Sequence, residues 1–109
     1  MTEAIYYILI ALRKPNHGYG IILEVGSLTK GRVNLGAGTL YGAIQSLLDK
    51  KWISLYSVET TSRKKKEYHI TPEGIAALKA ERLRLNELLE NGKFIDELST
   101  PERSLGFDS

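Results

Sequence analysis

GTLYGAIQSLLDKKWI, residues 38–53, is a helical pattern with two unlike faces. Five apolar side chains share one arc at about 100° per residue: Leu40, Ala43, Ile44, Leu47 and Leu48. The opposite arc carries small and polar residues, with Thr39 and Tyr41 at its borders: Gly38, Gly42, Gln45, Ser46 and Asp49. The apolar stripe predicts burial on one side. A solvated helix face normally carries Glu and Lys, so the bare face predicts close contact with another surface.

The net charge of +2 combines two unlike parts of the chain. Residues 1–66 hold ten Lys and Arg against four acids, giving +6, whereas residues 67–109 hold five against nine, giving −4. Such an asymmetry favours a polyanionic partner for the basic part and a different task for the rest. An unevenly charged solvated surface is the alternative.

Length and composition argue against several classes of protein. A chain of 109 residues is expected to bury one core. Without cysteine there is no disulfide framework or thiolate metal site, and with two histidines we expect neither a metal nor a cofactor. No nucleophile motif is present, so we expect no catalytic residue and no enzyme. The glycines at 36–42 miss the dinucleotide-binding spacing by one residue.

Residues 4–12, AIYYILIAL, are nine consecutive apolar positions. The run is too short for a bilayer, which needs about 20 residues. The three residues before it lack the basic charge of a signal peptide, so we expect a cytoplasmic protein with no membrane segment. A helix here is apolar nearly all round, and a partner subunit is the expected cover for its second side. Tyr6, Tyr7 and Trp52 are core residues by type, but they could line a cavity at such an interface.

The segments between residues 15 and 51 predict a helix-turn-helix. After a turn at 15–18, a second helix is expected to about residue 29, with its apolar stripe at Tyr19, Ile22 and Val25. Its two glycines are interpreted as places of close helix–helix contact: Gly20 and Gly26. A loop at 30–37 then leads into the bare-faced helix, which has the place of a recognition helix.

Two strands, residues 52–59 and 66–70, predict a β-hairpin. Its inward side chains are expected to be Ile53, Leu55, Tyr68 and Ile70. The connection at 60–65 is polar and has no Asn-Gly or Asp-Gly pair, so we expect a protruding loop of several residues. A basic run lies at its end: Arg63, Lys64, Lys65 and Lys66. Such a run is usually a solvated loop, but behind a bare-faced helix it favours contact with nucleic-acid phosphates.

Residues 71–73, TPE, predict the start of a long helix, with a hydroxyl cap, a proline at the first position and an acid in the first turn. We expect this helix to reach Asn91, with a stop at Gly92 and a short amphipathic turn at 93–98. So small a domain cannot cover its whole apolar stripe, so we interpret the helix as a dimerisation arm. Residues 99–109 are expected to be disordered.

The bare helix face offers several groups to DNA. Gln can pair bidentately with adenine, whereas Thr and Tyr more often hold phosphate. Tyr41 borders the buried stripe and could belong equally to the core. Gly38 and Gly42 would let the backbone approach a groove, and helix packing is their alternative role. A phosphate could also meet the amides at the start of this helix.

Several segments, in this order and spacing, resemble the PadR family of bacterial winged-helix transcriptional regulators. They are HGYGI at 17–21, GTLYGAIQSLLDKKWI at 38–53 and KKKEYHITPEGIAAL at 64–78, with a long helix after them. The resemblance covers about residues 3–92, and the C-terminal part is similar to the subfamily with one dimerisation helix.

The resemblance implies an α+β winged helix-turn-helix fold with an added long C-terminal dimerisation helix. Residues 1–71 would form the DNA-binding region and 72–98 the dimerisation helix with its extension, within one compact domain. The homodimer would be built from residues 4–12 and 72–91. Family members usually repress transcription, and some release DNA on binding a small aromatic effector. Residues 72–91 contain no aromatic side chain, so this helix supplies no aromatic platform for such a ligand.

The sequence therefore predicts a homodimeric repressor that binds a near-palindromic operator in double-stranded DNA. The expected DNA contacts are Gly38, Thr39, Tyr41, Gln45, Arg63, Lys64, Lys65 and Lys66. The alternative is a winged-helix module whose bare helix face docks on a protein without specific DNA binding.

Overall fold

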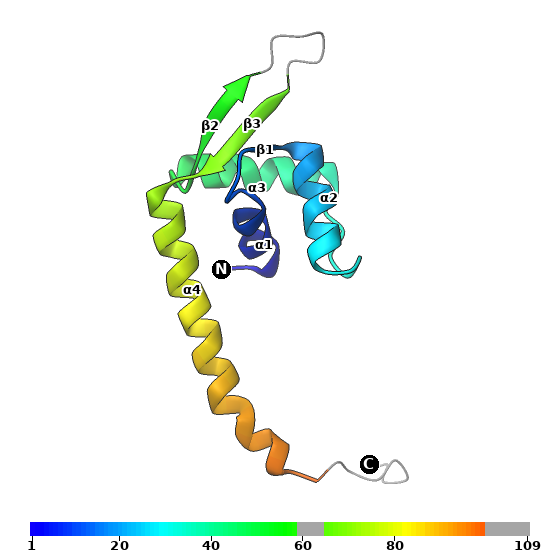
Figure 1. The fold of residues 1–109 in the computed structure, drawn as a ribbon, viewed down its shortest axis with the longest axis vertical. Helices are drawn as coiled ribbons and strands as arrows, with labels where there is room; N and C mark the ends of the chain where they lie inside the picture. Colours follow the sequence, from blue (N-terminus) through cyan, green and yellow to red (C-terminus); the bar gives the residue numbers. More distant parts are fainter. Residues whose placement is uncertain (59–64, 100–109) are drawn as a thin grey trace.

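A computed structural model describes residues 1–58 and 65–99. The elements follow in the order α1 (Glu3–Ala11), β1 (Asn16–His17), α2 (Gly18–Leu28), α3 (Ala37–Asp49), β2 (Ile53–Val58), β3 (Lys66–Ile70), α4 (Pro72–Asn91) and the 3-10 helix η1 (Gly92–Glu97). Figure 1 shows α1, α2, α3 and the sheet gathered in one body, from which α4 projects. Three helices around a small antiparallel sheet confirm the predicted α+β class.

The core is centred on α1. Ile8, Leu9 and Leu12 are fully buried, and the Leu12 carbonyl accepts a hydrogen bond of 2.9 Å from the Ile70 amide, which ties the end of α1 to β3. The second side of α1 is half-buried within this one chain, at Tyr6, Tyr7 and Ile10. The cover of this side by a partner subunit stays a prediction.

The helix α3 buries the predicted stripe. Leu40, Ile44 and Leu47 are at most 3% exposed, and two further residues pack partly against the core: Ala43 and Leu48. The helix ends at Asp49, slightly earlier than expected. Lys51 adopts a φ of 63°, a left-handed conformation that cannot continue a right-handed helix and turns the chain toward β2.

The stripe that α2 buries overlaps the predicted one, because Val25 is fully buried and Ile22 packs partly against the core. Its buried residues are Gly18, Ile21 and Val25, whereas Tyr19 is 64% exposed. Both stripes fit helical spacing, and contacts with α1 and α3 select between them. The glycine interpretation is wrong: a Cβ on Gly26 would meet nothing within 4 Å, and a Cβ on Gly20 would collide with the Asn16 side chain instead of another helix.

The sheet has three antiparallel strands in the order β1-β3-β2. Tyr68 and Ile70 of β3 are 7% and 5% exposed, as predicted for inward residues. The sequence did not predict β1, which pairs with β3 through Asn16 opposite Tyr68 and His17 opposite Glu67. A strand of two residues has no periodicity of its own, so only its partner reveals it.

The expectation that Leu55 faces the core is wrong, because this side chain is 49% exposed. Ile53, at the base of the hairpin, is 2% exposed and does face the core. Leu55 lies two residues further out, beyond the cover of the helices. The pairing with β3 then slips between Leu55 and Ser57, so alternation does not continue along β2.

The start of α4 is fixed by the predicted cap. The Thr71 hydroxyl accepts a hydrogen bond of 3.0 Å from the Gly74 amide and donates one of 2.7 Å to the Lys51 carbonyl. Gly74 itself lies so close to the Trp52 carbonyl that a Cβ could not be added without displacing backbone. The helix is therefore held against the base of β2 at this end.

Beyond its first turns, α4 leaves the body. The whole molecule measures 62 × 27 × 20 Å. Leu78 still packs partly against the core, and every residue from 82 to 90 is exposed. The exposed residues include four leucines: Leu83, Leu85, Leu88 and Leu89. After Asn91 the chain continues into η1, which confirms the expected short turn.

Two expectations fall on residues 59–64 and 100–109, outside the described part of the chain. They are the tip of the hairpin with Arg63 and Lys64, and nearly all of the tail expected to be disordered.

Candidate nucleic-acid interface

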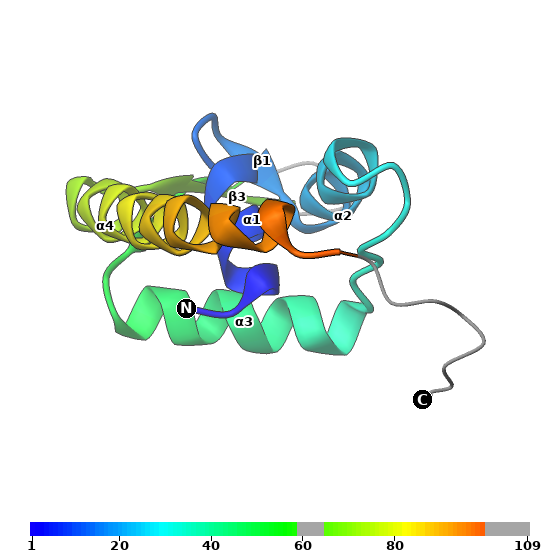
Figure 2. The ribbon, with the colours of Figure 1, turned by 90° about the horizontal axis from the view of Figure 1, so that it is seen from below.

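The exposed face of α3 is the starting point of the site. Viewed along the long axis of the molecule, α3 forms one flank, with its outer side free of other helices (Figure 2). The residues named for this face are all exposed: Gly38, Thr39, Tyr41, Gly42, Gln45, Ser46 and Asp49. The two-faced wheel is thus confirmed, and the contact of this face with DNA stays a prediction.

The beginning of α3 carries unused backbone donors. Its N-cap residue is Gly36, which has no side chain to cap the helix. The first intrahelical bond runs from the Leu40 amide to the Gly36 carbonyl, at 2.9 Å. The amides before Leu40 therefore face outward at the positive end of the helix dipole, which suits an anion such as phosphate.

Space around the two glycines of α3 decides one of the alternatives left open by the sequence. A Cβ built on Gly38 or Gly42 would meet no atom of this chain within 4 Å. These glycines therefore do not serve helix packing within the described part of the chain. They leave a smooth strip of backbone that can approach another molecule.

Gln45 lies in the middle of the exposed face and is already oriented. Its side-chain amide donates a hydrogen bond of 3.1 Å to the Asp49 carboxylate, one turn further along α3. The amide oxygen and one N–H remain free for a base edge. Asp49 thereby holds the donor side of Gln45, and it also adds a negative charge near the expected phosphates.

Tyr41, at the border of the buried stripe, is exposed but also contacts the start of α2, and its contact with DNA stays a prediction. Its side chain is 55% exposed, yet its ring crosses toward the start of α2. A Cβ on Gly18 would lie 2.6 Å from the Tyr41 hydroxyl oxygen, so the ring closes directly over this buried glycine. The side chain is therefore placed by packing while its hydroxyl stays available.

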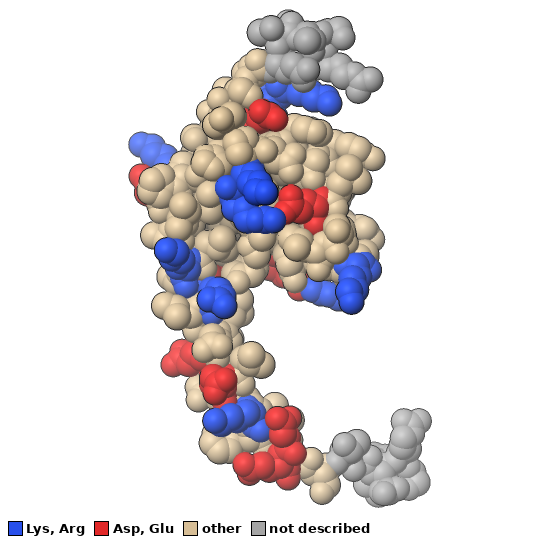
Figure 3. Space-filling view, viewed as in Figure 1, with Lys and Arg blue, Asp and Glu red and all other residues tan. Residues whose placement is uncertain are grey.

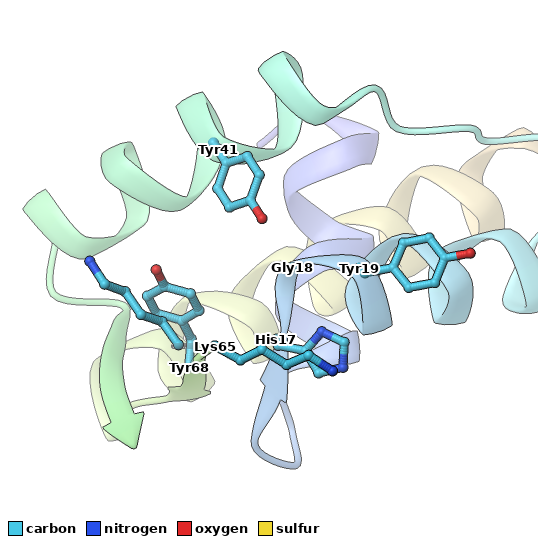
Figure 4. A pocket seen from close by; sticks show the side chains of 7 residues that line it. His17, Gly18, Tyr19, Tyr41, Lys65 and Tyr68 are labelled. Atoms are coloured by element: carbon cyan, nitrogen blue, oxygen red, sulfur yellow. The ribbon is translucent and has the colours of Figure 1, made fainter. Parts of the chain in front are cut away.

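The β2–β3 hairpin, called the wing below, brings its lysines to the same place. Lys65 and Lys66, the two described members of the basic run, line a cavity of about 400 Å³. The other lining residues are His17, Gly18, Tyr19, Tyr41 and Tyr68. Figure 4 shows the Tyr41 and Tyr68 side chains extending into this space from α3 and from the wing. The cavity thus joins α3, the start of α2 and the wing, and it is called the junction cavity below.

Four lining residues of the junction cavity were missed as site residues by sequence reasoning: His17, Gly18, Tyr19 and Tyr68. His17 caps α2, where its Nδ1 accepts a hydrogen bond of 3.3 Å from the Gly20 amide. The available signal was the position of HGY directly before a helix start, where backbone donors collect. Tyr68 gave no such signal, because alternation assigns it to the core.

Charge is distributed unevenly over the molecule. Figure 3 shows basic side chains beside the wing and across the body, and acidic ones gathered toward the free end of α4. This distribution matches the +6 and −4 parts of the sequence. On this face, the charge favours contact of a polyanion with the body over contact with the far end of the arm.

The phenol of Tyr68 lines the junction cavity and has a shifted pKa. Burial raises the pKa of Tyr68 above its ordinary value, and nearby Tyr41 adds to the effect. The Tyr68 hydroxyl is therefore a protonated donor throughout the physiological range.

Other kinds of site find no support in residues 1–58 and 65–99. No group of three His, Asp or Glu side chains gathers there as potential metal ligands. In the same residues, no helix combines the length and the apolar character needed to cross a membrane.

Comparison with known proteins identifies the family. A model described as the transcriptional regulator PadR-like family matches residues 7–80. The chain belongs to this family. It is therefore a transcriptional regulator of the DNA-binding, generally non-enzymatic PadR type, and the resemblance noted from its motifs is confirmed.

Solved structures of other transcriptional regulators share the fold. A PadR family transcriptional regulator from Eggerthella lenta aligns with a TM-score of 0.73 and 23% identity, covering 87% of this chain and 82% of that chain. A PadR-like transcription factor from Bacteroides fragilis aligns with a TM-score of 0.70 and 26% identity, covering 84% and 87%. A transcriptional regulator from Clostridium thermocellum gives 0.68 and 22%, covering 90% and 93%. A search of curated proteins found no significant match.

These similarities confirm the winged-helix architecture with a long C-terminal helix. In this PadR fold, α2 and α3 form the helix-turn-helix and the β2–β3 hairpin forms the wing.

Proposed function

We propose that this PadR regulator is a homodimeric, cytoplasmic repressor that binds a near-palindromic operator in double-stranded DNA. The observation that supports it best is the junction cavity, where the recognition helix and two wing lysines converge. A bare helix face beside a basic hairpin suits a duplex, whose groove admits the helix while phosphates meet the lysines.

Roles follow from the position of each group. Gln45, exposed at the centre of α3, is proposed to read a base edge, and Thr39 and Tyr41 to hold phosphate or a base near the helix start. Gly38 is proposed to let the backbone approach the groove. The lysines of the wing are proposed to neutralise phosphates: Lys64, Lys65 and Lys66, together with Arg63.

The homodimer is proposed to form through residues 4–12 and 72–91. The leucines of α4 support this, because Leu83 and Leu89 are each 71% exposed on an arm that no other described element covers. Exposed apolar surface of this kind marks an interaction site. Twofold symmetry would place two α3 helices on half-sites about 10 base pairs apart or a multiple of that. A Leu89→Lys variant should sediment as a monomer, and an unchanged dimer would exclude this face.

A small aromatic effector is proposed to bind between α1 and α4. A cavity of about 250 Å³ lies there, with Tyr6 and Tyr7 on one wall and Glu81 and Arg84 on the other. The two tyrosine rings meet edge to face at 6.1 Å. Trp52, also expected at such a cavity, lies elsewhere, with the Lys50 ammonium 4.8 Å from its ring centre. Phenolic acids and flat aromatic cations should be titrated against the protein–DNA complex, and the proposal fails if none of them releases DNA.

The proposed function is tested by selecting bound duplexes from genomic fragments with the purified protein. Enrichment of one near-palindromic motif is expected, and the alternative protein-docking module predicts no enrichment at moderate salt. A Gln45→Ala variant should then change base preference on that motif. Equal losses on the selected and a scrambled duplex would assign Gln45 no role in readout.

A further inference from the structure

The junction cavity contains a buried polar group that the fold does not use. Tyr68 is 7% exposed, and its ring packs with the core. Its hydroxyl forms no hydrogen bond with residues 1–58 and 65–99, and burial raises its pKa. A buried hydroxyl without a partner lowers the stability of the folded state. The position therefore calls for a partner from outside the chain.

The surroundings of this hydroxyl define the chemistry of that partner. Tyr68 and Tyr41 both extend into the cavity, one from the wing and one from α3 (Figure 4). Lys65 and Lys66 supply positive charge at the rim. Gly18 and Tyr19 open the 11-residue helix α2, whose first backbone amides lie at the positive end of its dipole. Phenol hydroxyls, ammonium groups and amides all donate, so the site suits an acceptor with negative charge.

We propose that the junction cavity is a seat for one DNA backbone phosphate, in which the buried Tyr68 hydroxyl donates a hydrogen bond to a phosphate oxygen. This proposal rests on the DNA-binding function proposed above. The seat connects α3 to the wing, so one phosphate fixes the angle at which both meet the duplex. Tyr68 carries no sequence information and acts as a positioning residue for Gln45.

Removing the hydroxyl separates this role from a structural one. Tyr68→Phe keeps the ring in the core and deletes only the unpartnered oxygen. Its melting temperature should be equal to or higher than that of the natural chain, because a buried unpaired donor is lost. Its affinity for DNA should fall roughly tenfold on both the selected and a scrambled duplex, the size expected for one hydrogen bond to a charged group.

The salt dependence provides a second, independent readout. A neutral phenol releases no counterion, so Tyr68→Phe should leave the slope of log K against log salt unchanged. Lys65→Ala should reduce the same slope by about one. A Tyr68→Phe variant that changed the slope would refute a neutral hydrogen bond at this seat.

The matched control is Tyr56→Phe. Tyr56 lies on the same hairpin, packs against His69 at 5.9 Å between ring centres and does not line the junction cavity. This variant should bind DNA as the natural chain does. An equal loss in both variants would overturn the proposal.

A phosphate scan on the natural chain locates the seat without any substitution in the protein. Single neutral methylphosphonates are placed along the selected duplex and affinity is measured by fluorescence anisotropy. At one position per half-site, the methylphosphonate should lower the affinity of the natural chain. At that position it should add no further loss to the already weakened binding of Tyr68→Phe. If the ratio of the two proteins' affinities were the same at every modified position, the seat would be refuted. If the natural chain binds no duplex, the proposed function itself fails, which is a different result.

Inorganic phosphate provides the last arm of the test. Millimolar phosphate should leave the melting temperature unchanged at constant ionic strength, because the seat is completed only by a duplex held at several points. A stabilisation that disappears in Tyr68→Phe would assign the cavity to a free anion and overturn the assignment to DNA backbone.

Discussion

The surface of α3 at Gly38 and Gly42 carries no side chains. Replacing Gly42 by alanine tests whether this surface serves contact with DNA and not folding. Gly42 lies inside α3, where glycine lowers helix stability because its backbone is the most flexible. A Cβ at this position would meet no atom within 4 Å, so no steric penalty offsets the gain in helix propensity. The Gly42→Ala variant should therefore unfold with a free energy about 1 kcal/mol higher.

The same methyl group should weaken DNA binding. It would stand on the exposed face of α3, where the backbone is expected to approach the floor of the groove. We expect a loss of at least tenfold in affinity, or about 1.4 kcal/mol. The variant should thus be more stable and less able to bind, a combination that general misfolding cannot produce.

The assay combines thermal melting with anisotropy titration, both at one fixed protein concentration because the proposed dimerisation would couple to unfolding. For a chain of this size the melting temperature should rise by roughly 4–8 °C. Gly26→Ala in α2 is the matched control, since its added Cβ also meets open space and lies outside the proposed interface. It should raise or preserve stability and leave DNA binding unchanged.

Either of two results would refute the reasoning. Unchanged DNA affinity of Gly42→Ala would show that the glycine strip of α3 does not approach DNA closely. A lower melting temperature would show that the space over Gly42 is filled in solution, by a partner subunit or another segment.

Three further outcomes are expected. Gly74→Ala should destabilise the fold by about 2 kcal/mol or more in chemical denaturation, because its Cβ would strike the Trp52 carbonyl and neither backbone can yield; a neutral effect would show that α4 is free to shift. Hydrogen bonding to Arg32 lowers the pKa of the Glu3 carboxyl. The pair therefore stabilises the fold at pH values above the unfolded pKa of about 4.3, and this stabilisation is lost as the pH falls through the lower pKa of the folded state. Glu3→Gln should therefore flatten the acid limb of stability against pH, and an unchanged limb would exclude the pair as a contributor. Lys65→Ala should weaken binding to all duplexes alike, and a loss confined to the selected motif would point to base readout instead.

The sequence by itself determined the elements whose side chains repeat with a clear period. The stripe of α3 and the cap at Thr71 were predicted correctly, because neighbours along one helix decide them. The family resemblance came from motifs in order, and it led to the correct fold and class of function. The Arg63 and Lys64 assignments lie outside the described residues and stay predictions.

Tertiary structure decided what depends on a partner far along the chain. In α2 two stripes fit the helical period, and only packing against α1 and α3 buries Ile21 and exposes Tyr19. β1 exists because β3 pairs with it. The junction cavity is lined by residues of α2, α3 and the wing, so no local sequence pattern predicts it. Tyr68 follows the alternation of an ordinary core residue, and only the assembled fold reveals that its hydroxyl lies in a cavity beside two lysines, with no hydrogen-bond partner among residues 1–58 and 65–99.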